Sequence, residues 1–201
     1  MIAIIDYGLG NVQAFNDVYS RLNIPVSIAR SSKDLLKASK LILPGVGSFD
    51  HAIRKLNESG MLNNIEDLVI NKQIPILGVC VGMQMLAFSS EEGNSKGLGW
   101  ISATVKRFES GNGLILPHMG WNNVYPNKHD GLFKRINKDM KFYFLHEYYF
   151  DAFEKSEIEA IANYEGKFVC SVRKNNIFGV QFHPEKSHHF GMELLKNFAE
   201  I

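Results

Sequence analysis

The sequence predicts an α/β protein with an open, mostly parallel sheet, helices on both faces, and antiparallel strands added in the second half. Three observations support this. The first 90 residues alternate short apolar runs with helical patterns. The strand-like runs there are apolar throughout, as in parallel strands that helices cover on both faces. After Trp100 the strand-like runs follow one another closely, as in antiparallel hairpins.

In the first half, four apolar runs predict strands and the segments between them predict helices. Ser31 and Asp34 form an S-x-x-D signal for the start of a short helix. The predicted strands are IAIID (2–6), IPVSIA (24–29), KLILPG (40–45) and IPILGVC (74–80). The predicted helices carry Val12, Phe15, Tyr19 and Leu22; then Ala52, Ile53 and Leu56, ending near Gly60; then Leu62, Ile65 and Leu68.

In the second half, the predicted strands add to the edge of the sheet. Lys174-Asn175-Asn176 reads as a hairpin turn, and Met192, Leu194, Leu195 and Phe198 predict a closing amphipathic helix. No repeat or linker interrupts the chain, so we expect one domain over residues 1–201. The predicted strands are ISATVKRF (101–108), GLILPH (113–118), FYFLHEYYF (142–150), EIEAIANY (157–164) and KFVCSVRKNNIFGVQFH (167–183).

Composition excludes several classes of protein. The 22 basic and 21 acidic residues give a net charge of +1, which argues against a nucleic-acid or membrane surface. The start, MIAIIDYGLGN, has no basic segment of a signal peptide, and no apolar stretch approaches the ~20 residues that span a bilayer. Only 2 cysteines are present, which make no disulfide framework. We therefore expect a soluble, cytoplasmic protein.

The segment ILGVCVGMQ (76–84) places one of these cysteines between two glycines. Gly78-Val79-Cys80-Val81-Gly82 has the G-x-nucleophile-x-G pattern of a sharp strand-to-helix turn, where neighbours without a Cβ atom are needed. The first N–H groups of the following helix favour a thiolate and can hold an oxyanion. The alternative is a buried cysteine whose glycines serve close helix packing. Cys170 has no glycine nearby and is expected in the core.

A base and its orienting group follow in GVQFHPEKS (179–187). His183 ends a predicted strand and Glu185 can turn back onto its imidazole, although His-Pro-Glu by itself is equally a simple turn. The other histidines lack metal-ligand spacing, so we expect no metal. DYGLGN (6–11) lacks the third glycine of a dinucleotide site, because Gln13 stands there, so we expect no cofactor.

Taken together, these motifs resemble the class I, triad-type glutamine amidotransferases. That family carries P-G-x-G, G-x-C-x-G-x-Q and H-P-E in this order, which here are 44–47, 78–84 and 183–185. DYGLGN, GLGWISATVKRF (97–108), PHMGWN (117–122) and GVQFHPEKS are similar to one branch, the subunits that supply ammonia to imidazole glycerol phosphate synthase. The resemblance spans nearly the whole chain and implies the family's fold.

The resemblance also implies a role for each matching residue. Cys80 would attack the carboxamide of glutamine, His183 would act as base and acid, and Glu185 would orient His183. Oxyanion donors would come from the backbone of Val81 and of 45–47, the latter after a peptide reorients. The oxyanion and substrate positions are thus Gly45, Val46, Gly47, Val81, Gln84, Glu147 and Tyr148.

In that branch the ammonia passes into a (β/α)8-barrel cyclase subunit of a heterodimer. There it joins a ribulosyl nucleotide and yields imidazole glycerol phosphate and an aminoimidazole ribotide, in histidine biosynthesis. Asn11, Trp121 and Lys186 match positions on the face toward that barrel. Each also fits a simpler role: Asn11 as a helix cap, Trp121 as a core residue and Lys186 as a solvated charge.

Two residues depart from the family pattern. Val81 replaces the usual leucine, which leaves the backbone donor in place. Glu147 stands where the family has serine or threonine, and its carboxylate would repel the glutamine carboxylate unless it turns away or pairs with a cation. Glu147 keeps open a paralogous glutaminase that feeds a related barrel, for example in amidination of a surface sugar. Two further classes of protein stay open: a cysteine hydrolase or peptidase, and a non-enzymatic regulatory subunit.

Overall fold

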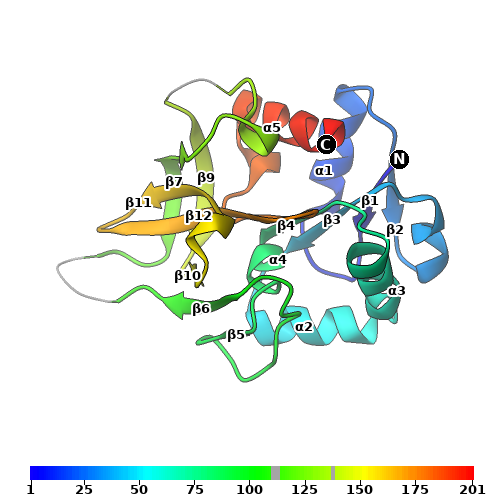
Figure 1. Cartoon of the computed structure of the whole chain (residues 1–201), viewed down its shortest axis with the longest axis horizontal. Helices are drawn as coiled ribbons and strands as arrows, with labels where there is room; N and C mark the ends of the chain where they lie inside the picture. Colours follow the sequence, from blue (N-terminus) through cyan, green and yellow to red (C-terminus); the bar gives the residue numbers. More distant parts are fainter. Residues whose placement is uncertain (110–113, 137–138) are drawn as a thin grey trace.

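The centre of the molecule is a row of parallel strands in the order β2-β1-β3-β4-β13 (Figure 1). The computed structural model describes residues 1–109, 114–136 and 139–201. The side chains of β1, β4 and β13 are buried throughout, as predicted for strands covered on both faces. The strands are β1 (Ile2–Ile5), β2 (Val26–Ala29), β3 (Lys40–Gly45), β4 (Ile76–Cys80) and β13 (Ile177–Val180).

Helices cover both faces of this row. In Figure 1, α1 (Val12–Arg21) and α5 (His188–Glu200) lie together above the sheet and α2 (Phe49–Glu58) lies below it. Each turns its apolar residues to the sheet; in α1 these are Phe15 and Tyr19, whose hydroxyl donates to Leu195 O at 3.1 Å. The segment after α2 continues as α3 (Leu62–Glu66) and one π-helical turn, η2 (Asp67–Asn71). The start signal at Ser31 forms the predicted capping box, but on a 3₁₀ helix, η1 (Ser32–Lys37).

Antiparallel strands extend the sheet beyond β13, as predicted. The sheet continues through antiparallel β12, β10 and β6 to the short β5, which pairs with β6 in parallel, and β11 pairs with β12 and β8. β13, predicted among the antiparallel strands at the edge, instead runs parallel to β4 in the central row. Lys174 pairs with Ile177, so the hairpin turn falls at Asn175-Asn176, as the sequence predicts. These strands are β5 (Ser89–Ser90), β6 (Ala103–Arg107), β8 (Tyr125–Pro126), β10 (Tyr148–Ala152), β11 (Ile158–Asn163) and β12 (Lys167–Lys174).

Two predicted strands were wrong in their extent. FYFLHEYYF divides at Glu147 into β9 (Lys141–His146) and β10, and β9 pairs with β7 (His118–Asn123) in a separate two-stranded sheet. The run is apolar on both sides of the break, so its pattern does not reveal that the chain changes sheets. GLILPH is not a strand over 114–117, since β7 begins at His118, and Gly113 lies outside the described residues.

Short 3₁₀ turns complete the chain: η3 (Gly131–Phe133), η4 (Lys155–Glu157) and η5 (Pro184–Lys186). Within the described residues, no helix is long and apolar enough to cross a membrane.

The carboxyl ends of the central strands meet at one edge. Gly45 at the end of β3 lies beside Cys80 at the end of β4, and Val180 of β13 pairs with Val79. In open α/β sheets this edge is where ligands bind. The fold therefore brings all three predicted motifs to one place.

Candidate active site

Cys80 lies at a sharp turn between β4 and the short helix α4 (Val81–Gln84). Its backbone has φ 56° and ψ −114°, a conformation that residues with a side chain rarely adopt. Such strain persists where the surroundings enforce it, and it occurs preferentially at active sites. The predicted strand-to-helix turn is present.

The surrounding glycines are required by close backbone contacts. A Cβ on Gly82 would lie 1.9 Å from Leu43 O, and one on Gly78 would lie 2.6 Å from Gly82 O. A Cβ on Gly45 would lie 2.3 Å from the Gly82 nitrogen. No side chain fits at these distances, so the glycines allow β3, β4 and α4 to approach and present Cys80 at the tip.

The run after Cys80, VGMQMLAF (81–88), has the composition of a helix of about two turns, but the helix in the structure is shorter. α4 ends at Gln84, and Leu86 N and Ala87 N close 3₁₀-type bonds to Met83 O and Gln84 O. The chain then joins the sheet, where Phe88 N donates to Ala103 O at 2.9 Å. One turn sums few peptide dipoles, so the groups that act on the sulfur are mainly the local N–H groups and His183.

His183 lies just beyond the end of β13 and is held from two sides. Its backbone N–H donates to Tyr143 O at 2.8 Å, and its Nδ1 donates to Glu185 Oε1 at 2.9 Å. Burial alone would lower the pKa of His183, but hydrogen bonds to Cys80 and Glu185 and their negative charge raise this pKa to about 10. The imidazolium is therefore the stable form at neutral pH beside the sulfur.

Cys80 and His183 open into a cavity of about 360 Å³. It contains most of the predicted substrate positions; Gly45 lies beside Cys80 at the end of β3, and Glu185 lies behind His183 with its side chain 1% exposed. The lining residues are Val46, Gly47, Cys80, Val81, Gln84, Glu92, Pro117, Leu145, His146, Glu147, Tyr148, His183 and Lys186.

Glu92 is a lining residue that the sequence reasoning missed. Its Oε2 accepts from Phe49 N at 2.8 Å, at the start of α2, and burial raises the pKa of its carboxyl. A carboxylate in the wall of this cavity suits a ligand ammonium group. No motif marks Glu92, because it lies in a loop that only the tertiary structure brings to the site.

Glu147, which departs from the family pattern, is paired with a cation. Its carboxylate lies 3.3 Å from the Arg107 guanidinium, on the neighbouring strand β6. The condition under which a carboxylate is tolerated here, pairing with a cation, is therefore met.

The DYGLGN motif supports the P-G-x-G segment. The Tyr7 hydroxyl donates to Pro44 O at 2.8 Å, and a Cβ on Gly10 would lie 2.6 Å from Pro44 Cβ. Gly10 has φ 99°, which also favours glycine. This loop therefore packs directly against the segment that lines the cavity.

Of the predicted interface residues, Trp121 is 46% exposed, which rules out the alternative that it is a core residue. Its ring stacks on His188 at 4.9 Å, and Lys186 Nζ lies 5.7 Å from the ring centre of Tyr143. Asn11 is exposed at the N-cap of α1, where its side chain makes no capping hydrogen bond.

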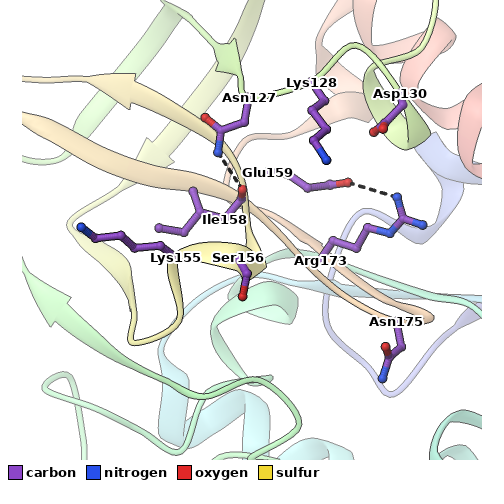
Figure 2. Close-up of a pocket in the computed structure, with 9 residues that line it drawn as sticks. All are labelled: Asn127, Lys128, Asp130, Lys155, Ser156, Ile158, Glu159, Arg173 and Asn175. Atoms are coloured by element: carbon purple, nitrogen blue, oxygen red, sulfur yellow. Dashed lines mark hydrogen bonds and ion pairs between the residues drawn. The ribbon is translucent and has the colours of Figure 1, made fainter.

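A larger cavity, about 560 Å³, lies elsewhere (Figure 2). Arg173 Nη1 faces the Glu159 carboxylate at 3.9 Å across it, and burial raises the pKa of Glu159 to about 7. Asn175, in its wall, precedes β13 and so lies at the end of the sheet opposite Cys80. Among the described residues its lining contains no cysteine or histidine, so it lacks a nucleophile–base pair. Nor is any cluster of side chains in the described part of the chain arranged to hold a metal ion.

Comparisons with known proteins agree with this geometry. The family model "Glutamine amidotransferase class-I" matches residues 3–201. The chain is 55% identical to the imidazole glycerol phosphate synthase subunit HisH of Bdellovibrio bacteriovorus and 52% identical to that of Leptospira borgpetersenii, each over 100% of both chains. The solved structure of PurLQS from Thermotoga maritima has the same fold, with a TM-score of 0.77 at 14% identity over 99% of this chain and 97% of that one. The chain therefore belongs to the class I glutamine amidotransferases and, within them, to the HisH subunits of imidazole glycerol phosphate synthase.

Proposed function

We propose that this chain hydrolyses glutamine to glutamate and ammonia and delivers the ammonia to the cyclase subunit of imidazole glycerol phosphate synthase, in cytoplasmic histidine biosynthesis. The observation that carries this proposal is the strained Cys80 at the sheet edge beside His183, which Glu185 orients at 2.9 Å. We further propose that the chain acts as one domain.

In the proposed reaction, the Cys80 sulfur attacks the carboxamide carbon of glutamine. The carbonyl electrons move to oxygen, and the N–H groups of Val81 and of the 45–47 segment hold the resulting oxyanion. As the C–N bond breaks, His183 gives its proton to the leaving nitrogen, and ammonia and a thioester form.

The thioester is then hydrolysed by water. His183, now neutral, takes a proton from water as the oxygen attacks the thioester carbon. Glutamate leaves, and the proton returns the Cys80–His183 pair to its starting state. Glu185 holds the ring and stabilises the imidazolium in both steps, because its buried carboxylate remains bonded to Nδ1.

The α-amino group and the α-carboxylate of glutamine bind at different places in the cavity. Glu92 binds the α-amino group, since it is the partly buried carboxylate in the cavity wall that no cation neutralises in the described structure. The α-carboxylate lies against the backbone of 147–148, where the Glu147 side chain is held by Arg107. Gln84 also lines the cavity, and its Nε2 donates to Tyr148 O at 3.3 Å.

The outer face of the β7–β9 pair is the proposed docking surface for the barrel subunit. Met119, Trp121 and Leu145 are exposed there and alternate with buried His118, Phe144 and His146. Leu145 also lines the cavity, so a partner on this face would lie next to the source of ammonia. Asn11 and Lys186 extend the same edge, since α1 packs against η5. Exposed apolar groups beside a polar rim are typical of subunit interfaces.

We expect Trp121→Ala to weaken association with the barrel subunit by at least ~30-fold, because large aromatic side chains at interface centres contribute about 2 kcal/mol or more. The dissociation constant is measured by calorimetry. Leu36→Ala is the matched control, since Leu36 is 78% exposed in a separate hollow with Lys72, near the amino end of β4. Equal affinities of the two variants would contradict the docking surface.

A paralogous glutaminase is the second candidate function, and the only observation in its favour is Glu147 in place of the family's serine or threonine. Because Arg107 pairs with this residue, the substitution gives no reason to expect weakened glutamine binding. The full-length identity of 52–55% to two HisH subunits supports the histidine pathway.

The test measures glutamate release by this chain mixed with the cyclase subunit, with and without the ribulosyl nucleotide. We expect strong stimulation by the complete mixture and formation of imidazole glycerol phosphate at the same rate. A folded complex that releases glutamate without forming this product would contradict the pathway, and stimulation by a sugar-modifying barrel would favour the paralogous glutaminase.

Glu185→Gln should lower glutaminase turnover by ~10²-fold, less than removal of the nucleophile, because an orienting group does not react. Loss of the negative charge also lowers the pKa of His183, to which Glu185 contributes. Wild-type activity should fall as pH rises through about 10, the pKa of His183, and in the variant this fall should begin at lower pH. A wild-type rate and an unchanged pH profile would remove Glu185 from the triad.

A further inference from the structure

PHMGWN places His118 at the start of β7, directly opposite His146 at the end of β9. Both side chains are buried, at 3% and 6% exposure. Their rings form one hydrogen-bonded pair, with His118 Nδ1 and His146 Nε2 2.9 Å apart. The proposed reaction uses neither residue.

The partners of this pair fix the position of every proton. Tyr148 O, 2.8 Å from His146 Nδ1, can only accept, so His146 carries its proton on Nδ1. His146 Nε2 therefore accepts from His118 Nδ1, and His118 Nε2 accepts from Asn122 Nδ2 at 3.2 Å. Burial lowers the pKa of His118 to about 4 and that of His146 to about 3, consistent with two neutral rings.

This series of hydrogen bonds ends at the point where one strand gives way to another. β9 ends at His146 and β10 begins at Tyr148, in a different sheet, so the His146–Tyr148 bond bridges the break. Residues 145–148 all line the substrate cavity. The backbone at this break is therefore bridged by a hydrogen bond from His146, and His118 supports the same tautomer by donating to His146 Nε2.

The same carbonyl connects the pair to the nucleophile. Gln84 Nε2 donates to Tyr148 O at 3.3 Å and to Gln181 Oε1 at 3.1 Å, and Gln181 Nε2 donates to Cys80 Sγ at 3.7 Å. Cys80 itself is held mainly by the glycine-lined backbone turn, where added Cβ atoms would collide with backbone. The first effect of losing the pair should thus fall on the 145–148 wall.

We propose that His118 and His146 are positioning residues that hold the 145–148 wall in its glutamine-binding conformation through a neutral, tautomer-fixed imidazole relay. This inference rests on the proposed glutaminase function, since the wall is assigned to glutamine. It extends that function by giving a task to the histidine of PHMGWN.

His146→Leu and His146→Asn test this proposal in the complex with the cyclase subunit. Leucine fills similar space without a donor, and asparagine keeps an N–H group near the Nδ1 position. We expect His146→Leu to raise KM for glutamine ~10-fold while kcat changes less than ~3-fold, and His146→Asn to recover most of the KM. His129→Leu is the control, because His129 Nδ1 also bonds a backbone carbonyl, Ile136 O at 3.1 Å, outside the cavity.

Folding is separated from positioning by the double variant His118→Leu/His146→Leu. Replacing both partners leaves no buried polar group unpaired within the pair, so its stability should stay close to wild type. We expect it to show the same rise in KM. An unchanged KM in a folded double variant, or equal losses in His146→Leu and His146→Asn, would overturn the proposal.

A second measurement does not depend on activity. In ¹⁵N-edited imidazole spectra of the wild-type chain, both rings should be neutral with the proton on Nδ1 at pH 7. An Nε2-protonated His146 would overturn the relay even where glutamine hydrolysis is confirmed. Wild-type complex without glutaminase activity, by contrast, would contradict the proposed function whatever the spectra show.

Discussion

Cys80→Ala should abolish glutamine hydrolysis, with a loss of at least ~10³-fold, because no other group in the described lining of the cavity can form the thioester. The variant keeps the Cβ atom, so the backbone at φ 56° is under the same strain as in the wild type. Apart from its interaction with His183, it loses only weak sulfur contacts, to Gln181 Nε2 at 3.7 Å and Leu145 O at 3.9 Å. Folding and binding to the barrel subunit should therefore stay close to wild type.

Glutamate release is measured with saturating partner and ribulosyl nucleotide, and folding by thermal unfolding. Cys170→Ala provides the control, since Cys170 is fully buried in β12, as the sequence predicts. It should cost about 1 kcal/mol of stability through lost packing, with turnover retained. Glutamine-dependent turnover above ~1% of wild type in Cys80→Ala would count heavily against Cys80 as the nucleophile.

Gly82→Ala should destabilise the fold by at least about 3 kcal/mol or prevent folding, because the added Cβ would lie 1.9 Å from Leu43 O. Neither the added Cβ nor Leu43 O can move away, because each is attached to the backbone of a packed element, α4 and β3 respectively. The free energy of unfolding is obtained from urea titration, with turnover measured on any folded fraction. Residual folded protein should have lost activity, because α4 would be displaced from Gly45 and from the oxyanion donors.

Gly60→Ala is the control for Gly82→Ala, because it introduces backbone strain without a steric collision. Gly60 has φ 68°, so alanine there is strained, but its Cβ would meet nothing within 4 Å. This substitution should cost about 1–2 kcal/mol without loss of glutaminase activity. If Gly82→Ala proved no more destabilising than Gly60→Ala, the close approach of α4 to β3 would not be essential.

β1 to β4 could be predicted because each is a short apolar run beside a helical pattern, whereas the sequence pattern does not indicate that β13 runs parallel to β4. β1, β3 and β4 fall inside the predicted ranges, as does the hairpin after Lys174. The break at Glu147 could not be predicted, because the residues on both sides are equally apolar and aromatic. The sequence also does not indicate that α4 is so short. Most residues of VGMQMLAF are buried whether or not they are helical, so this apolar run fits a longer helix equally well.

In the site, the triad residues lie within motifs whose spacing indicates their chemistry. No sequence spacing indicates the contacts of Glu92, Gln181 or the His118–His146 pair, which reach the cavity or its wall from separate elements. Their partners are distant in the chain: 97 residues separate Gln84 from Gln181. Local sequence patterns carry no information on contacts of this kind.

The sequence by itself determined the α/β class, the turn at Cys80 and the order of the three motifs, because glycine spacing and apolar periodicity act over a few residues. Only the tertiary structure decided which groups surround the sulfur, how Glu147 is neutralised, and how two buried histidines share their protons. These depend on which strand ends meet at the sheet edge and on the burial that results, and both arise only when the whole chain packs.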